Sequence, residues 1–466
     1  MDYYFYDYDH ALPEDDERIV YKFTEKDISE VFINCIEPSF RQIAKYVVTI
    51  ISWNFTFRFL WALFVVTGRN IFLIGHILSI VCGFSVLYIT VGDSVFYLIA
   101  FAIFGYGILI GLFSTRRFYQ IGPIFLIINL TILTICELFY NDPKIWHRIR
   151  GIQMISTMKI VSVAFDLDKK KLNRIPNLVQ YMGYILCPAN SALGPWVAYD
   201  EYLATFTGPA LRVTGIGWAI LNGTFSVIFL ILSNCVVSMI CSDLSWKWLV
   251  AYRDALEFRC SHYFVSLLSQ ATMCAAGLIK PNEDSQIYGV IVTRPWEIEI
   301  PRSLVTVVTN WNVPMHRWLK TYIFKSVKPH GTPLAIFATY LVSSFLHGLN
   351  TPIYLVLLSL GVYTYVEYQW RQKFSQAFDA CVLTTACKSE NCGHSMNQIS
   401  PVSIILNTIF GLLTIVNLAY LGVIFEASSN LQDDEGYSFW HAWSKWNNLN
   451  FAGHWMAVAG YIFYLL

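Results

Sequence analysis

The sequence is dominated by long apolar stretches, several of them long enough to cross a lipid bilayer as a helix. A transmembrane helix needs about 20 mostly apolar residues to span roughly 30 Å of hydrocarbon. Because no water is available there to satisfy backbone N–H and C=O groups, such stretches form helices. The sequence therefore predicts an all-α fold, a polytopic transmembrane helical bundle. The clearest predicted spans are 71–91, 95–113, 121–140, 216–241, 352–366 and 402–425, and two shorter ones are 333–349 and 451–466.

Three further apolar stretches are interrupted by charged or helix-breaking residues. We expect them to be tilted, interfacial or re-entrant, which brings the bundle to about nine to eleven spans plus re-entrant pieces. The Gly-Pro-Trp tract at 194–196 indicates either non-helical backbone beside an internal cavity or an ordinary interfacial turn. The interrupted stretches are 43–66, which contains Arg58; 152–165, which contains Lys159; and 178–196, which contains Pro188 and Pro195.

Charged residues are few and balanced in sign. Only 14% of the 466 residues are charged and 55% are apolar, whereas a soluble domain carries about a quarter charged residues. Lys plus Arg and Asp plus Glu both number 32, so the chain has no net basic field for nucleic acid. We therefore expect membrane lipid around the protein and no nucleic-acid partner.

The amino-terminal segment is acidic, with seven Asp or Glu among the first seventeen residues. This composition differs from the basic start of a secretory signal and is typical of a solvated arm. We expect an acidic, flexible tail at 1–40, cytosolic or lumenal, and a single membrane domain at 41–466. Two basic polar segments, 280–328 and 166–174, are expected to protrude, and the positive-inside tendency assigns them to the cytosolic face.

The eleven cysteines form no recognisable disulfide framework. Most of those inside apolar stretches, including Cys235, are expected to pack as small hydrophobes. The one group close in sequence is Cys381, Cys387, Cys392 and His394, whose spacing matches no common structural zinc pattern. We expect no metal there and favour loop thiols, a local disulfide or an acylated cysteine.

Two polar residues in apolar surroundings are the main candidates for chemistry. His347 lies near the end of an apolar span, and ionisable residues within membranes are commonly functional; the alternative is an imidazole satisfied by a neighbouring hydroxyl at the membrane boundary. Asn312 precedes Pro314 at the start of a predicted interfacial helix, where it is either functional or a helix cap. Trp311 and Trp318 would then be ordinary interfacial anchors.

An imidazole of near-neutral pKa can take a proton from a hydroxyl while the hydroxyl oxygen attacks a thioester. An amide such as that of Asn312 can orient this base or donate a hydrogen bond to the developing oxyanion. Motifs for ATP hydrolysis, zinc proteolysis, serine hydrolysis and dinucleotide binding are absent. Weaker candidates are expected to be snorkelling or boundary residues: Glu137, Asp93, Lys159 and the tract 199–202.

A set of short strings, in this order, resembles the membrane-bound O-acyltransferase family over nearly the whole chain. The strings are RGIQM at 150–154, AFDLD at 164–168, YMGY at 181–184, GPW at 194–196, PRS at 301–303, WNVPM at 311–315, LHG at 346–348 and TYVE at 364–367. The acidic tail does not take part in this resemblance.

The resemblance implies a multi-pass enzyme of the endoplasmic reticulum membrane with helices around a central catalytic tunnel. It implies transfer of a palmitoleoyl group from palmitoleoyl-CoA to a serine of Wnt proteins, with no tightly bound cofactor. The histidine of the family falls on His347, as general base, and its companion polar residue on Asn312. We expect four substrate-binding residues within reach of these two: Trp311, Tyr340, Ser344 and Asn350.

The alternative is a multi-span transporter of lipids or small molecules, which would also combine many spans with isolated intramembrane polar groups. Few acids fall within the apolar stretches, and no repeat relates the two halves of the chain. Both observations count against transporters built from duplicated units.

Overall fold

The computed structural model describes residues 28–66, 72–115, 120–139, 143–207, 213–240, 246–281, 287–289, 291–348, 350–387, 392–425 and 439–465. The described residues of the amino-terminal half are helical apart from short turns, the connection 169–177 and the buried irregular segment 186–198. Its helices are α1 (Ile28–Val31), η1 (Phe32–Ile36), α2 (Glu37–Val66), α3 (Phe72–Val91), α4 (Ser94–Thr115), α5 (Ile121–Phe139), α6 (Pro143–Asp168), α7 (Leu178–Ile185), α8 (Tyr199–Thr207), α9 (Val213–Ile231), η2 (Leu232–Val236) and α10 (Val237–Ile240).

The carboxy-terminal half begins with the long helix α11 (Lys247–Ala275). A short antiparallel pair, β1 (Ile279–Pro281) and β2 (Ile287–Gly289), is the only sheet in the described part of the chain. The remaining helices are α12 (Pro295–Glu299), α13 (Leu304–Trp311), α14 (Val313–Trp318), η3 (Leu319–Phe324), α15 (Lys325–Val327), η4 (Lys328–His330), α16 (Thr332–Leu346), α17 (Thr351–Phe378), α18 (Pro401–Gly422), η6 (Val423–Phe425), α19 (Phe439–Asn448) and α20 (Ala452–Leu465).

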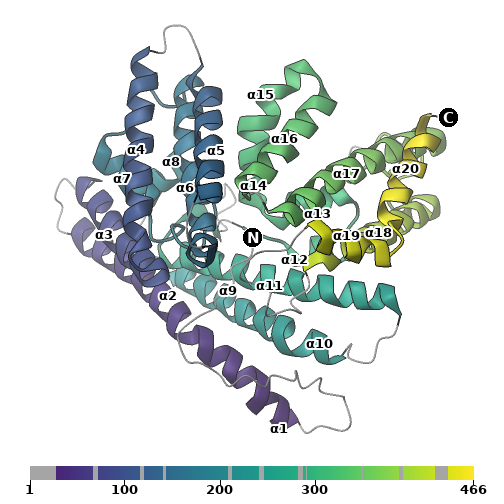
Figure 1. Cartoon of the computed structure of the whole chain (residues 1–466), viewed down its shortest axis with the longest axis horizontal. Coiled ribbons are helices and arrows are strands. Elements are labelled where there is room, and N and C mark those ends of the chain that lie inside the picture. The colour runs from purple at the N-terminus through teal and green to yellow at the C-terminus, as the bar shows by residue number, and fades with distance from the viewer. Residues whose placement is uncertain are drawn as a thin grey trace.

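The helices form two groups joined by α11. Figure 1 shows α3 to α8 on one side and α17 to α20 on the other, with α9 and α11 beneath them. The larger apolar core belongs to the first group and a smaller one to the second. Helix α11 packs along α9 and against α18, so it connects the two cores. Helices α14 to α16 lie between the groups (Figure 1).

The predicted all-α membrane fold is confirmed. Among the described residues, six helices are long and apolar enough to cross a membrane. They agree with the predicted spans at 71–91, 95–113, 121–140, 216–241 and 402–425. The sixth includes most of the interrupted stretch at 43–66, which was expected to be tilted, interfacial or re-entrant but is long and apolar enough to span. The predicted span at 333–349 corresponds to the shorter apolar helix α16. Helix α11 matches no predicted span, because its charged and amide side chains lower its hydropathy although most of its carboxy-terminal half is buried.

The segment 178–196 is only partly helical and is buried almost throughout. It forms the short helix α7 and then irregular backbone up to α8, and every residue from 181 to 199 is buried. Protein therefore covers this non-helical backbone, as irregular backbone within a membrane bundle would need. Gly83 of α3 allows the close approach, since a Cβ there would overlap the carbonyl group of Leu186.

Lys159 holds this irregular segment in place. Its Nζ donates hydrogen bonds to the carbonyl oxygens of Tyr184 and Ile185, at 3.0 and 2.9 Å, and to Oδ1 of Asn190 at 2.8 Å. The side chain is fully buried in α6, so the prediction that Lys159 snorkels to the boundary is wrong. A buried ammonium is tolerated because all three of its protons have acceptors.

The tract 199–202 is also buried more than expected, whereas Asp93 is exposed in the turn between α3 and α4, as predicted. Tyr199 and Tyr202 lie in the larger core. Both carboxylate oxygens of Glu201 accept hydrogen bonds from Arg317, at 2.6 and 2.7 Å. This bidentate pair connects α8 to α14, whereas Asp200 of the same tract is exposed.

The long polar segment 280–328 does not protrude as predicted. Most of its described part, 291–328, folds into α12 to α15 and η3 against the bundle. Trp318 is fully buried and its Nε1 donates to the carbonyl oxygen of Met158, at 3.0 Å, so it is not an interfacial anchor. Tyr322 donates a hydrogen bond to Asp166 of α6, at 3.0 Å. Apolar and aromatic side chains between the charged ones explain this burial.

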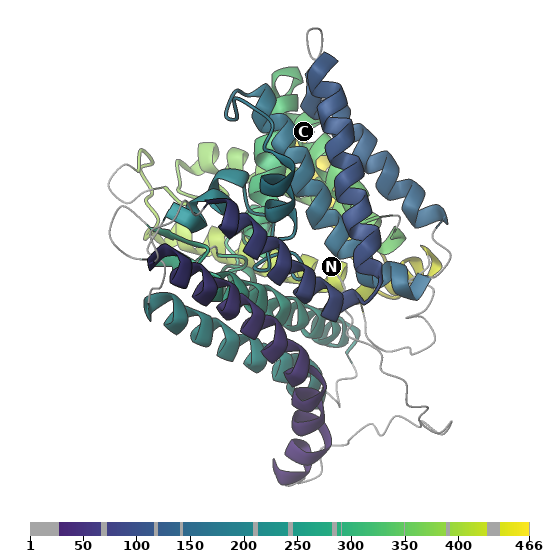
Figure 2. The same ribbon diagram turned by 90° about the vertical axis from the view of Figure 1, so that its left-hand side faces the viewer.

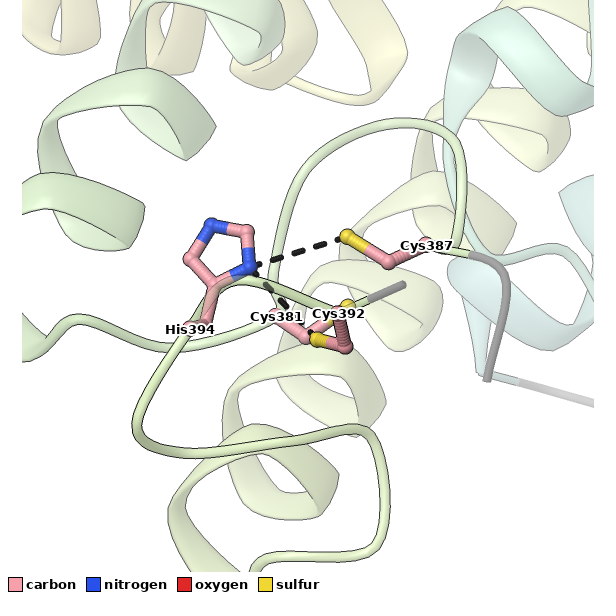
Figure 3. A group of neighbouring side chains, drawn as sticks. All are labelled: Cys381, Cys387, Cys392 and His394. Carbon is pink, nitrogen blue, oxygen red and sulfur yellow. Dashed lines mark hydrogen bonds between the residues drawn. The ribbon is translucent and has the colours of Figure 1, made fainter. Parts of the chain in front are cut away.

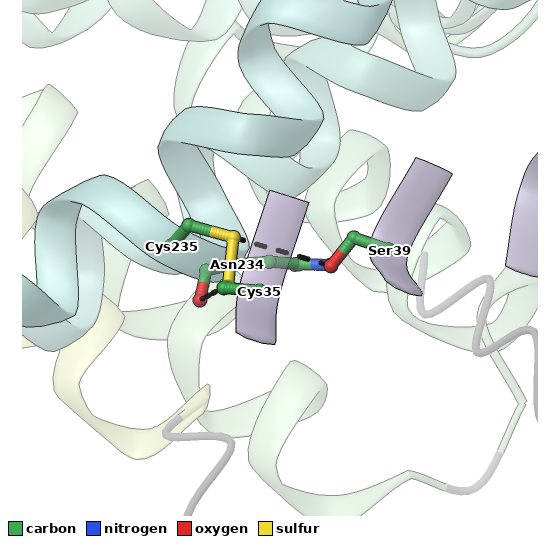
Figure 4. The surroundings of a disulfide bond; sticks show 4 residues. All are labelled: Cys35, Ser39, Asn234 and Cys235. Atoms are coloured by element: carbon green, nitrogen blue, oxygen red, sulfur yellow. Dashed lines mark hydrogen bonds between the residues drawn. A yellow bond between two sulfur atoms is a disulfide. The ribbon is translucent and has the colours of Figure 1, made fainter. Parts of the chain in front are cut away.

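A disulfide joins Cys35 of η1 to Cys235 of η2 (Figure 4). Cys235 therefore does not pack as a free small hydrophobe, and no sequence pattern indicates the pairing because 200 residues separate the two cysteines. Of the predicted tail at 1–40, residues 1–27 lie outside the described residues, and residues 28–40 are helical and continuous with α2.

The disulfide also bears on orientation, because disulfides persist in oxidising compartments. Asp168, within the basic segment 166–174, accepts hydrogen bonds from the first N–H groups of α5. Figures 1 and 2 show α1 and this end of α5 at opposite extremes of the molecule. An oxidising compartment on the disulfide side agrees with a cytosolic location of the basic segment.

Candidate active site

His347 lies directly after the last residue of α16. Its backbone N–H donates to the carbonyl oxygens of Ser343 and Ser344, at 3.3 and 3.0 Å. Gly348 then takes a φ of +78°, a left-handed conformation that favours glycine and ends the helix. The half-buried imidazole therefore lies at the carboxy-terminal end of α16, where the backbone turns sharply.

Glu137 of α5 packs against this turn. A Cβ on Gly348 would overlap its carboxylate, so the glycine also provides space for the acid. Glu137 pairs with Arg150 of α6, with 3.4 Å between Oε1 and Nη1, and only 13% and 11% of the two side chains are exposed. The prediction that Glu137 is a snorkelling or boundary residue is thus wrong, since a largely buried ion pair holds it beside His347.

Several polar atoms around this turn have no partner within the described part of the chain. The imidazole of His347 makes no side-chain hydrogen bond there, so the interpretation of a histidine satisfied by a neighbouring hydroxyl has no support. Oε2 of Glu137 and the hydroxyl of Tyr354 are buried without partners among the described residues. Most buried polar groups are hydrogen-bonded, so polar atoms without protein partners in the described structure lie close to His347.

Asn312 occupies the junction between α13 and α14. Its Oδ1 accepts the backbone N–H of Met315 at 3.0 Å, and Pro314 lies in the first turn, so Asn312 caps α14. The capping interpretation is therefore confirmed. No hydrogen bond joins Asn312 to His347 among the described residues. The capping bond uses the amide oxygen of Asn312.

The four expected substrate-binding residues have structural contacts of their own. Trp311 stacks on His262 of α11, with ring centroids 4.1 Å apart and planes at 9°. Tyr340 lies 3.4 Å from the hydroxyl of Thr364 on α17. Ser344, one turn further along α16, donates to the carbonyl oxygen of Tyr340 at 2.9 Å. Asn350 caps α17.

Sequence reasoning missed His262 and underrated Glu137 and Arg150. His262 is buried in α11, and its Nε2 donates to the carbonyl oxygen of Trp311, at 2.9 Å. It therefore supports the backbone immediately before Asn312. The available signal for Glu137 was an acid at the end of a span followed thirteen residues later by Arg150, but such spacing does not reveal a contact between two helices.

Comparisons with known proteins show which family the chain resembles. The profile of the membrane-bound O-acyltransferase family matches residues 144–389, which include His347 and Asn312. The protein-serine O-palmitoleoyltransferase porcupine of Anopheles gambiae is 35% identical over 499 residues, covering 100% of both chains. The protein of the same name from Mus musculus is 31% identical, covering 93% of this chain and 96% of its own.

More distant relatives carry a different name. Lysophospholipid acyltransferase 1 of Arabidopsis thaliana is 23% identical over 300 residues, covering 52% of this chain and 63% of its own. Together, the family profile and the full-length similarity show what kind of protein this is. The chain belongs to the membrane-bound O-acyltransferase family, and it is a multi-pass membrane acyltransferase.

Proposed function

We propose that this enzyme transfers a palmitoleoyl group from palmitoleoyl-CoA to a serine hydroxyl of Wnt proteins at the endoplasmic reticulum membrane. The similarity that carries the proposal is the 35% identity, over the whole of both chains, to a protein-serine O-palmitoleoyltransferase. The relatives named above are acyltransferases, which favours group transfer over the transport alternative.

In the proposed reaction, the neutral imidazole of His347 accepts the proton of the serine hydroxyl while the serine oxygen attacks the thioester carbonyl carbon. The tetrahedral intermediate collapses, the C–S bond breaks, and the CoA sulfur takes the proton from the imidazolium. The products are an O-acyl serine and CoA. The NH2 group of Asn312 orients the imidazole or donates to the oxyanion. The surrounding bundle excludes water that would otherwise hydrolyse the thioester.

The four substrate-binding residues are proposed because of their positions relative to His347 and Asn312. Tyr340 and Ser344 are seven and three residues before His347 and follow the same face of α16. Trp311 and Asn350 flank Asn312 and His347 in the chain. We assign to these four a role in shaping the acyl and acceptor sites, consistent with the packing contacts already described.

The proposal is tested with purified full-length protein in lipid nanodiscs, alkynyl palmitoleoyl-CoA and a folded Wnt domain. We expect label on one serine, released by hydroxylamine as an ester is, and no label when that serine is replaced by alanine. A parallel reaction contains lysophospholipid as acceptor. Label on the lipid without label on the protein, or movement of the fatty acid across the membrane without any ester, would contradict the proposal.

The variant N312D distinguishes the proposed catalytic role of Asn312 from its role as a helix cap. Aspartate caps a helix as well as asparagine does, but it lacks the NH2 donor. We expect α14 to remain intact and kcat to fall at least about tenfold with little change in KM for acyl-CoA. Steady-state kinetics with both substrates measures this split.

The matched control is N177D, because Asn177 caps α7 through the same type of bond, to the N–H of Gln180 at 2.9 Å. That variant is expected to retain wild-type kinetics. Equal activity in N312D and the wild type would leave Asn312 as a helix cap alone.

A further inference from the structure

The loop between α17 and α18 brings together four side chains that can bind a metal ion. These are the thiols of Cys381, Cys387 and Cys392 and the imidazole of His394 (Figure 3). Their four candidate ligand atoms all lie within 4.8 Å of one another. Cys381 is fully buried, and the other three residues are half-buried. These four residues form the Cys3His cluster, which lies outside the candidate active site.

The distances within the Cys3His cluster approach those of a tetrahedral zinc site. With Zn–S of about 2.3 Å and Zn–N of about 2.0–2.1 Å, a sulfur and a nitrogen ligand are about 3.6 Å apart and two sulfurs about 3.8 Å apart. The Sγ atoms of Cys387 and Cys392 both lie 3.6 Å from Nδ1 of His394. Because no pair of ligand atoms exceeds 4.8 Å, closure around an ion moves them by about 1 Å at most.

Nε2 of His394, the ring nitrogen that faces away from the thiols, has a hydrogen-bond partner, as is common in metal sites. Nε2 of His394 lies 3.0 Å from the hydroxyl of Ser375 on α17. That hydroxyl donates its own proton to the carbonyl oxygen of Ala380, at 2.9 Å, so it accepts from Nε2–H. Nδ1 is then the unprotonated nitrogen, with its lone pair directed at the two thiols. Ligating histidines commonly have such a partner on the ring nitrogen that does not bind the metal.

The backbone around Cys381 is fixed by cationic and amide side chains. Its carbonyl oxygen accepts from Nη2 of Arg302 at 2.8 Å and from Nδ2 of Asn407 at 3.1 Å. Arg371 donates to the carbonyl oxygen of Val382 at 2.8 Å. A Zn²⁺ ion with three thiolates and one neutral imidazole carries a net charge of −1, which the guanidinium group of Arg302 partly offsets, whereas Arg371 is already paired with Glu367.

We propose that the Cys3His cluster is a structural zinc site. All four ligand positions are filled by protein side chains, which is typical of structural rather than catalytic zinc. Binding replaces three S–H protons by Zn–S bonds and releases the protons to solvent. The ion fixes the loop that connects α17 to α18 and, through Arg302, the segment leading to α13. The sequence favoured free, oxidised or acylated thiols because the spacing of the ligands is irregular; their convergence is visible only in the fold.

The metal is measured by inductively coupled plasma mass spectrometry on full-length protein purified without a metal-chelate column. We expect about one zinc per chain in the wild type and a loss of at least about tenfold in the double variant C387S/C392S. The matched control is C136S, since Cys136 is a half-buried free thiol outside the cluster; it should retain wild-type zinc. This readout does not depend on acyl transfer, so it stands or fails separately from the proposed function.

A second measurement uses only the wild type, in case the double variant does not fold. Cys387 and Cys392 should resist alkylation by N-ethylmaleimide until the chelator TPEN is added, and peptide mass spectrometry identifies the labelled sites. Wild-type protein that lacks zinc overturns the proposal, whether its thiols are free, disulfide-bonded or joined to an acyl group. Full zinc content in a folded C387S/C392S variant overturns it as well.

Discussion

Replacing His347 by alanine is expected to lower acyl transfer about a thousandfold or more, because the reaction loses its general base. The imidazole makes no side-chain hydrogen bond within the described part of the chain, so its removal leaves no new unpaired group. The protein should therefore fold and bind acyl-CoA as before. Single-turnover transfer, a fluorescence melting curve and an acyl-CoA binding isotherm together measure these three properties.

The control for that variant is H330A. His330 is exposed just before α16 and lies at the end of this helix opposite to His347. Its replacement should leave transfer unchanged. Wild-type activity in H347A would remove His347 from the mechanism, whereas loss of both activity and melting temperature would indicate a structural role instead.

Replacing Lys159 by methionine is expected to destabilise the protein severely, lowering the free energy of unfolding by about 3 kcal/mol or more. Methionine matches the length of the side chain but leaves three buried oxygen atoms without their donor. The melting temperature should fall by about 5 °C or more. A fluorescence melting curve in detergent measures the shift.

Activity should fall with stability in K159M, because the segment held by Lys159 reaches the candidate site. The guanidinium carbon of Arg317 lies 5.0 Å from the centroid of the Trp196 ring in this segment. Arg317 belongs to α14, the helix that Asn312 caps. The control is K170M, since Lys170 is exposed just beyond α6. An unchanged melting temperature in K159M would show that the irregular segment is held by packing alone.

Most of the helical framework follows from hydropathy. The predicted spans 71–91 and 121–140 differ from α3 and α5 by one residue, since uninterrupted apolar stretches have no other stable structure in lipid. Helix α11 escaped prediction because its polar residues are satisfied by distant partners. Arg259 pairs with Glu299 at 2.7 Å, and Gln270 donates to Asn222 at 2.9 Å. The mean hydropathy of a segment is lowered by each polar residue, whether or not that residue has a hydrogen-bonding partner in the fold.

The candidate site was predictable in part. His347 stood out because an isolated imidazole in an apolar span needs a reason to be there. Glu137 and Arg150 did not, because their importance depends on two helices meeting beside Gly348. Asn312 had two interpretations in the sequence, and the fold confirmed the capping bond while leaving its proposed role in catalysis to experiment.

The sequence by itself determined the class of the protein and the position of its longest helices, and it singled out His347 as a candidate for chemistry. These depend on local composition, which apolar surroundings convert directly into helix. Only the tertiary structure decided which polar groups are compensated: Lys159 by three oxygens, Cys35 by Cys235, and Cys381, Cys387 and Cys392 by a shared approach to His394. The partners of Lys159 and Cys35 lie far away in the chain, and the irregular spacing of the cysteine group does not show that its side chains converge.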